Sequence, residues 1–216
     1  MIRWTVVIPA KALPAAKSRL LPASDDAESH RWLVESIRSD TLAAARAAEA
    51  TARVLVVTDL PGLADAIVQT RPGLNAALIE AADYAARTWP DDGVAALVGD
   101  LPALLPEQLT AALTEAAQHP RSFVADAAGS GTTLLTARPG IALDPAFGEG
   151  SAARHASAAV PLPAAQGLRC DVDTADDLRA AAELGVGPAT SVALARASGL
   201  PIRLPVHIDA ASWLHE

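Results

Sequence analysis

Three carboxylates in this sequence have the positions or the spacing that metal binding needs. Asp100 follows an apolar run, residues 94–98 (Val-Ala-Ala-Leu-Val), and a single glycine. A run of that length is typical of a strand buried on both faces, and open α/β sheets bind ligands outside the carboxyl ends of such strands. We therefore interpret Asp100 as a metal ligand at the edge of a buried sheet.

Asp171 and Asp173 form the second acidic feature, within residues 168–174 (Leu-Arg-Cys-Asp-Val-Asp-Thr). We predict an extended segment here, in which alternate side chains point to the same side. Two carboxylates on one side repel each other unless a cation lies between them, and a divalent metal would remove that repulsion. Alternatively, Asp173 and Thr174 cap a helix that begins at Ala175, and both interpretations can hold together.

Lys11 and Lys17 are the only lysines among 17 basic residues, and both follow the first predicted strand. Together with Ser18 and Arg19 they would suit a polyphosphate, because lysine acts as a point charge and arginine as a two-pronged donor. The segment lacks the glycine and lysine pattern of a P-loop. Chance clustering on a solvated loop is the competing explanation.

Two glycine-bearing loops could close on a second anion. Residues 127–131 (Ala-Ala-Gly-Ser-Gly) precede Thr132 and Thr133, whose hydroxyls and backbone amides could bind an anion. Residues 147–150 (Phe-Gly-Glu-Gly) precede Ser151 at the start of a predicted helix. There the exposed amides could form an anion site, or Ser151 could simply cap the helix.

The elements that must position these residues alternate along the chain, which predicts an α/β fold with a mainly parallel sheet between helix layers. Asn75 lies in the first turn of one predicted helix, where it either caps the helix or contacts a nucleotide. We predict strands over residues 4–9, 53–59, 94–98, 121–126 and 132–137, and helices over residues 27–52, 61–70, 74–88, 104–119, 175–184 and 189–197.

Composition excludes several other classes of protein. The chain has 216 residues, of which 51% are hydrophobic, so we expect one globular domain over residues 1–216, with a tail (201–216) of unassigned role. We expect neither a secretory leader nor a membrane helix, and the single cysteine fits a reducing cytoplasm. The net charge of -8 argues against binding to nucleic acid or an anionic membrane.

With these motifs in order, the chain resembles the phosphoenolpyruvate/2-phospholactate guanylyltransferases of coenzyme F-420 biosynthesis, which are relatives of the molybdenum-cofactor guanylyltransferases. The resemblance implies a three-layer α/β/α, Rossmann-like nucleotidyltransferase fold with a mainly parallel mixed sheet. Each motif is weak alone, and their order and spacing are specific. The motifs lie at residues 9–11, 16–20, 73–78, 99–102, 131–135, 147–151 and 171–174.

The resemblance also implies a reaction, in which GMP moves from GTP to the phosphate of a small phosphorylated carboxylic acid and pyrophosphate leaves. It places Lys11, Lys17 and Arg19 on the GTP phosphates, with Lys17 catalytic, and Asn75 near the guanosine. The remaining implied roles are Mg²⁺ binding by Asp100, Asp171 and Asp173, with Asp100 also catalytic, and binding of the acid by Thr133, Gly148 and Ser151.

The motifs leave several alternatives open. Phosphoenolpyruvate, 2-phospholactate and 3-phosphoglycerate differ only by small groups, so pocket shape must decide between them. The fold also serves molybdopterin and sugar-phosphate nucleotidyltransferases, and paired carboxylates occur in glycosyltransferases. A non-catalytic GTP-binding domain is a further alternative. We expect the product to pass to the next enzyme of its pathway, and the chain could form a homodimer.

Overall fold

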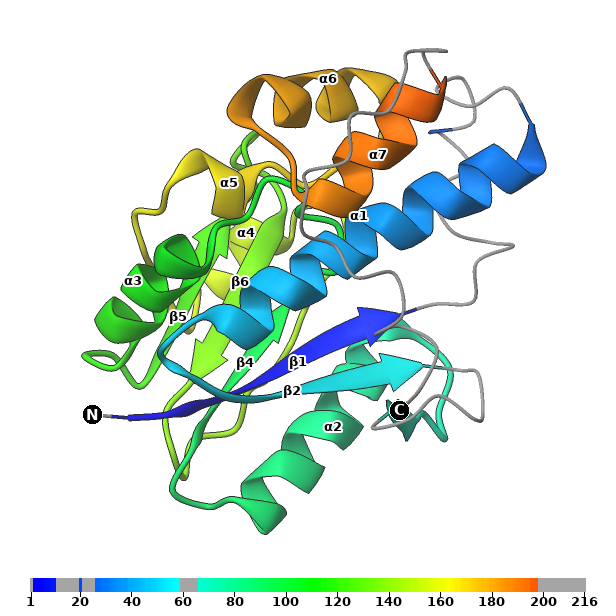
Figure 1. The fold of residues 1–216 in the computed structure, drawn as a ribbon. Coiled ribbons are helices and arrows are strands. Elements are labelled where there is room, and N and C mark those ends of the chain that lie inside the picture. The colour runs from blue at the N-terminus through cyan, green and yellow to red at the C-terminus, as the bar shows by residue number, and fades with distance from the viewer. Residues whose placement is uncertain (1, 11–19, 21–25, 59–65, 198–216) are drawn as a thin grey trace.

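The protein is described here by a computed structural model, which covers residues 2–10, 20, 26–58 and 66–197. Its described strands form one sheet in the order β3-β2-β1-β4-β6-β5-β7, with helices on both faces (Figure 1). The predicted three-layer α/β/α fold is therefore confirmed. The strands are β1 (Trp4–Ala10), β2 (Thr51–Thr58), β3 (Ala66–Val68), β4 (Gly93–Leu97), β5 (Arg121–Ala125), β6 (Thr132–Ala137) and β7 (Val160–Pro161). The helices are α1 (Ala27–Ala47), α2 (Leu74–Thr88), α3 (Pro106–Ala116), α4 (Ser151–His155), α5 (Gln166–Arg169), α6 (Ala175–Leu184) and α7 (Pro188–Ala197).

Strand direction decides which residues meet at each edge of the sheet. β1 runs parallel to β2 and β4, and β2 runs parallel to β3. β6 runs antiparallel to both of its neighbours, β4 and β5, with Leu97 opposite Leu134 and Ala125 opposite Thr132. The first residue of β6 therefore lies at the edge where β4 and β5 end.

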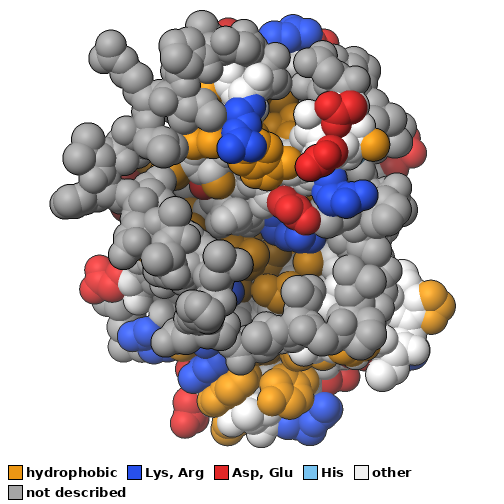
Figure 2. Space-filling view, turned by 45° about the vertical axis from the view of Figure 1, so that its right-hand side comes forward, with side chains coloured by type: hydrophobic (Ala, Val, Ile, Leu, Met, Phe, Trp, Pro, Cys, Tyr) orange, Lys and Arg blue, Asp and Glu red, His pale blue; other side chains and the backbone are white. Residues whose placement is uncertain are grey.

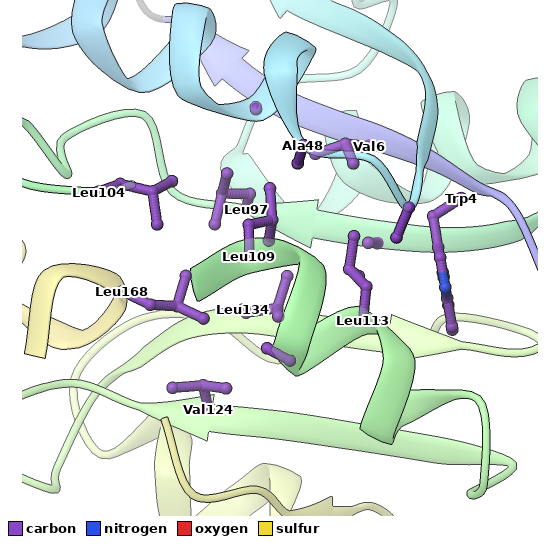
Figure 3. Packing of buried hydrophobic residues seen from close by; sticks show 14 of the residues in the cluster. Trp4, Val6, Ala48, Leu97, Leu104, Leu109, Leu113, Val124, Leu134 and Leu168 are labelled. Carbon is purple, nitrogen blue, oxygen red and sulfur yellow. The ribbon is translucent and has the colours of Figure 1, made fainter. Parts of the chain in front are cut away.

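The apolar run that precedes Asp100 is buried on both faces, as its sequence predicts. Ala95 and Leu97 of β4 belong to the hydrophobic cluster that includes Leu109 and Leu113 of α3 (Figure 3). Val94 and Ala96 belong to the cluster on the other face, which α2 covers. Because side chains alternate along a strand, helix layers on both faces require a continuous apolar sequence.

Helix α1 begins where the sequence predicts, because Asp26 caps it. The Oδ1 atom of Asp26 accepts hydrogen bonds from the backbone amides of Glu28 and Ser29, each at 2.8 Å. The helix ends at Ala47, earlier than predicted, and β2 begins at Thr51. Helix α7 packs along α1 (Figure 1), and α6 contributes Leu178 and Ala181 to the hydrophobic cluster that α1 shares with α7.

The prediction of a helix over residues 61–70 is wrong where the structure describes that segment. Ala66–Val68 form β3, which pairs in parallel with the end of β2, and residues 59–65 lie outside the described part. Backbone pairing with β2 outweighs the weak helical propensity of so short a segment. The tail (201–216) also lies outside the described residues. None of the described helices is both long and apolar enough to cross a membrane.

Candidate active site

Asp100 lies just beyond the carboxyl end of β4, held by backbone contacts on both sides. Its predecessor Gly99 packs against β1, and a Cβ there would lie 3.3 Å from both the Ile8 side chain and the Pro9 carbonyl oxygen. The next amide, of Leu101, donates to the Thr41 hydroxyl at 2.9 Å. The turn after β4 is therefore fixed between β1 and α1.

A second chain segment brings two more carboxylates to the same place. The backbone amide of Val172 donates to the carbonyl oxygen of Asp100 at 3.0 Å, which places Asp171 and Asp173 on either side of this contact. The first part of this segment is not extended as predicted, because Gln166–Arg169 form the short helix α5.

Arg169 fixes this acidic segment to the end of β5. Its guanidinium donates to the carbonyl oxygens of Ala125, at 3.1 Å, and Asp126, at 2.8 Å. The amide of Ala127 in turn donates to the carbonyl oxygen of Arg169 at 2.8 Å. Three hydrogen bonds thus set the position from which the chain continues to Asp171.

The electrostatics of Asp171 indicate a site for positive charge. Burial, and then the nearby charges of Asp100, Asp173 and Asp126, raise the pKa of the Asp171 carboxyl to about 7. A cation bound between these groups would lower that pKa and favour the ionised carboxylate. The four carboxylates therefore form a region of strongly negative potential.

The capping of α6 involves Thr174 and Asp177, and the two interpretations of residues 171–174 are both compatible with the structure. The Thr174 hydroxyl accepts from the Asp177 amide at 3.2 Å, and the Asp177 carboxylate accepts from the Thr174 amide at 2.8 Å. This capping box begins α6. The backbone amide of Asp173 also donates to the Asp177 carboxylate, at 3.2 Å, and the Asp173 side chain is exposed.

Asp126 is a site residue that the sequence reasoning missed. Its carboxylate accepts from the amides of Ser130, at 2.9 Å, and Gly131, at 2.7 Å. A Cβ at Gly131 would overlap this carboxylate. The loop amides expected to close on an anion therefore close on Asp126. The signal was available, since Asp126 follows a buried strand as Asp100 does.

The loop before α4 approaches the acidic residues from the other side of the site. Gly148 and Gly150 adopt positive φ angles of 123° and 70°, which few other residues tolerate. The amide of Ser151 donates to the Gly148 carbonyl at 3.0 Å, and that of Ala152 to the Ser130 carbonyl at 3.1 Å. Protein carbonyls thus engage these two amides of the expected anion site.

Thr132 rather than Thr133 faces the site. Thr132 begins β6, and its hydroxyl accepts a hydrogen bond from the Ser151 hydroxyl at 3.2 Å. Thr133 is fully buried, and its hydroxyl lies 3.5 Å from the Val124 carbonyl in the neighbouring strand. Alternation along β6 separates the two side chains, so the predicted role of Thr133 stays a prediction that its side-chain position does not favour.

Asn75 links α2 to the same loop. Its side-chain nitrogen donates to the Phe147 carbonyl at 3.1 Å, and its side-chain oxygen accepts from the Phe147 amide at 2.8 Å. It makes no capping bond, since Gly73 occupies the N-cap without one. This pair of bonds fixes the loop that leads to Gly148, and the predicted contact of Asn75 with a nucleotide stays a prediction.

The residues described above surround an open cavity of about 560 Å³. Figure 2, turned toward the carboxyl ends of β1 and β2, shows acidic and basic side chains close together on this face of the molecule, beside apolar side chains. The cavity is large enough for a small phosphorylated acid with part of a nucleotide. Its lining residues are Leu74, Val98, Asp100, Asp126, Ser130, Gly131, Thr132, Phe147, Gly148, Glu149, Gly150, Ser151, Asp171 and Asp173.

The donor set fits magnesium bound jointly by protein and substrate. Over the described residues, no three acidic, histidine or cysteine side chains are arranged as a complete metal site. Magnesium commonly takes only one or two protein carboxylates and completes its shell with water and phosphate oxygens. Burial of the Asp171 carboxyl, and then the nearby charges of Asp100, Asp173 and Asp126, raise its pKa, and a bound cation would offset both effects. Lys11, Lys17 and Arg19 lie outside the described residues.

Three solved structures illustrate the fold that this chain shares. A protein of Desulfovibrio desulfuricans G20 named as a nucleotide-diphospho-sugar transferase superposes with a TM-score of 0.62 at 19% identity, covering 82% of this chain and 85% of that one. A CMP:2-keto-3-deoxy-manno-octonic acid synthetase in complex with CTP superposes with a TM-score of 0.51 at 14% sequence identity, and the match covers 84% of this chain and 98% of that one. A Mycobacterium tuberculosis H37Rv protein in complex with manganese superposes with a TM-score of 0.50 at 22% sequence identity, again covering 84% of this chain and 98% of that one.

Sheet order, the reversed β6 and the acidic cavity at the carboxyl edge thus define a chain with the nucleotidyltransferase fold. No protein-family model matches the sequence. The phosphoenolpyruvate guanylyltransferase of Streptomyces coelicolor is 49% identical over 207 residues, covering 90% of this chain and 97% of the relative. The phosphoenolpyruvate guanylyltransferase of Geodermatophilus obscurus is 50% identical over 210 residues, covering 90% of this chain and 95% of the relative. The chain belongs to the phosphoenolpyruvate guanylyltransferase family.

Proposed function

We propose that this protein transfers GMP from GTP to the phosphate of phosphoenolpyruvate and releases pyrophosphate. The observation that carries the proposal is the cavity in which Asp100, Asp171 and Asp173 face the loop of Gly148 and Ser151. An acidic side suits a metal-bound nucleotide, and a side with glycines and hydroxyls suits a second anion. The names of the relatives favour phosphoenolpyruvate over 2-phospholactate or 3-phosphoglycerate.

The chemistry needs no general base. The second pKa of a phosphate monoester is about 6, so the attacking phosphate is already a dianion near neutral pH. His155, the histidine nearest the cavity among the described residues, has both ring nitrogens in hydrogen bonds within the protein. Its position beneath Thr132 keeps it away from the reacting phosphates, so the protein contributes mainly placement and charge compensation.

Each part of the site has a proposed role in that placement. Asp100, Asp171 and Asp173 would hold Mg²⁺, which supplies positive charge to the α-phosphate and the leaving pyrophosphate when bound. Gly148 and Ser151 would orient the phosphorylated acid opposite these carboxylates. From the family resemblance, Lys11, Lys17 and Arg19 would bind the GTP phosphates.

The biological setting follows from the same proposal. The product joins two phosphates through an anhydride on an acid, so the next enzyme must consume a labile compound. We assign this step to coenzyme F-420 biosynthesis, and we place it in the cytoplasm because the chain carries a single cysteine. A homodimer remains a prediction.

Pyrophosphate release tests the proposal. The protein is incubated with GTP, Mg²⁺ and one acid at a time, and the product is identified by mass. Phosphoenolpyruvate should give the fastest release and a product one GMP heavier than the acid. Release of GDP would indicate a glycosyltransferase-like reaction, and release with none of the acids would overturn the proposal.

A further inference from the structure

Three side chains beneath the cavity form a continuous hydrogen-bonded series. The Ser151 hydroxyl lies 3.2 Å from the Thr132 hydroxyl, which lies 2.8 Å from Nδ1 of His155. Nε2 of His155 lies 2.9 Å from the backbone nitrogen of Ala146. Ser151 and Thr132 line the cavity, and His155 lies behind them.

The Ala146 contact determines where the hydrogen on the His155 ring lies. A backbone amide can only donate, so Nε2 must accept and therefore carries no hydrogen. The neutral ring then carries its hydrogen on Nδ1 and donates it to Thr132. Burial, and then the charge of Arg154, lower the pKa of the His155 imidazole against an opposing effect of Asp144, which keeps the ring neutral.

The orientation of the ring is itself fixed by aromatic packing. The Phe147 ring meets His155 edge to face, with centroids 5.1 Å apart and planes at 70°. The Phe123 ring lies on another side, at 6.0 Å. A flipped imidazole would place a carbon against the Ala146 amide and leave that buried donor without an acceptor.

The tautomer has a consequence for the two hydroxyls. The Thr132 hydroxyl accepts a hydrogen bond from Nδ1 of His155, so it does not donate its own hydrogen to the ring. The Thr132 and Ser151 hydroxyls together carry two hydrogens, and the bond between them uses one. No further bond of either hydroxyl is made to the described residues, so one hydroxyl hydrogen is left for an acceptor in the cavity. With the other tautomer, Thr132 would donate to the ring, Ser151 would donate to Thr132, and none would be left.

We propose that His155 is a positioning residue that acts through Thr132 to make the Thr132–Ser151 hydroxyl pair a hydrogen-bond donor to an anionic oxygen of the phosphorylated acid. The inference rests on the proposed function, which places that acid beside Gly148 and Ser151. A carboxylate or phosphate oxygen can only accept, so a donor fixed toward the cavity favours it. This neutral donor lines the same cavity as the carboxylates, which would repel the same ligand.

The tautomer can be measured without any activity. Long-range ¹H–¹⁵N correlation on the full-length, ¹⁵N-labelled protein distinguishes a protonated from an unprotonated ring nitrogen, and the His155→Gln spectrum assigns the signals. We expect hydrogen on Nδ1 and none on Nε2 at neutral pH. Hydrogen on Nε2 would overturn the inference.

Kinetics of single and double variants test whether His155 acts through Thr132. His155→Phe keeps a ring but removes both nitrogens, and Thr132→Val keeps the shape but removes the hydroxyl. Thr132→Val removes the hydroxyl and His155→Phe removes the group that orients it, so each should raise KM for phosphoenolpyruvate, by up to roughly tenfold where one hydrogen bond to a charged group is lost, and change KM for GTP by less than about twofold. The double variant should resemble Thr132→Val alone, because the two changes break one series.

Additive effects in the double variant, or equal changes in both KM values, would overturn the inference and assign His155 a purely structural role. Thr132→Ser should restore KM for phosphoenolpyruvate toward that of the unaltered protein. If the unaltered protein releases no pyrophosphate with phosphoenolpyruvate, the proposed function fails, and the tautomer measurement then decides the hydrogen-bond series alone.

Discussion

The backbone amide of Val172 donates to the carbonyl oxygen of Asp100 across 3.0 Å. This bond joins two segments that lie about seventy residues apart in the sequence and brings two acidic features into one cavity. Val172 is fully buried, so its side chain anchors the contact while the carboxylates on either side remain at the cavity. The candidate site is thus assembled by a backbone contact.

Charge removal at Asp171 should separate stability from activity. Its raised pKa, about 7, means that ionisation above that pH opposes folding of the metal-free protein. At pH 8, Asp171→Asn should therefore raise the melting temperature without metal by a few degrees, since about 1 kcal/mol corresponds to roughly 2–4 °C at this size. The same variant should lose most pyrophosphate release. A lower melting temperature at pH 8 would contradict the conclusion that the buried charge of Asp171 is unfavourable without metal.

Arg169 should be needed to hold the acidic segment in place. Arg169→Met removes two hydrogen bonds to the carbonyls of Ala125 and Asp126, which should cost roughly 1–3 kcal/mol of stability and weaken metal binding. Chemical denaturation and Mg²⁺ titration measure the two effects. The matched control is Arg179→Met, because the exposed ion pair of Arg179 with Asp176 should contribute little. Equal effects of the two substitutions would refute the role given to Arg169.

Loss of the Asn75 side chain should free the loop at Phe147. Asn75→Ala removes both bonds to the Phe147 backbone, so hydrogen exchange of the Phe147 amide should accelerate markedly. Asn75→Asp keeps the acceptor and loses the donor, and it should give an intermediate rate. Unchanged exchange together with a raised KM for GTP would favour the nucleotide contact predicted from the sequence.

Stability should depend on His155 at mildly acidic pH. Its pKa is lowered from 6.5 in the folded protein, chiefly by burial, so the unfolded chain binds this proton more tightly. The contribution of neutral His155 to the free energy of unfolding is complete above pH 6.5, and it is lost as the pH falls from there through the lowered pKa. Between about pH 8 and pH 5, the melting temperature of the unaltered protein should fall more steeply than that of His155→Gln. Parallel curves would show that His155 is not the group responsible.

The sequence predicted those elements whose signals are local. The apolar run before Asp100 predicts a doubly buried strand, and Asp26 predicts a helix start. Both depend on chemistry within a few residues, and both are confirmed. The family resemblance rests on such local motifs in a fixed order, and the relatives confirm it.

The features that the sequence did not predict depend on distant contacts. The direction of β6 places Thr132 at the carboxyl edge, and no local signal distinguishes Thr132 from Thr133 when both faces of the strand are buried. The helical turn before Cys170 is set by the contacts of Arg169 with β5, some forty residues away in sequence. β3 likewise exists only because β2 lies beside it.

Asp100 is the residue on which the proposed transfer depends most directly. Pyrophosphate release from GTP and phosphoenolpyruvate should be measured for the unaltered protein and for Asp100→Asn, together with both melting temperatures. We predict a loss of roughly a hundredfold or more in rate with the fold intact, because the amide cannot replace a charged metal ligand. Near-normal release by Asp100→Asn would contradict the account of Asp100 as the metal anchor of GMP transfer.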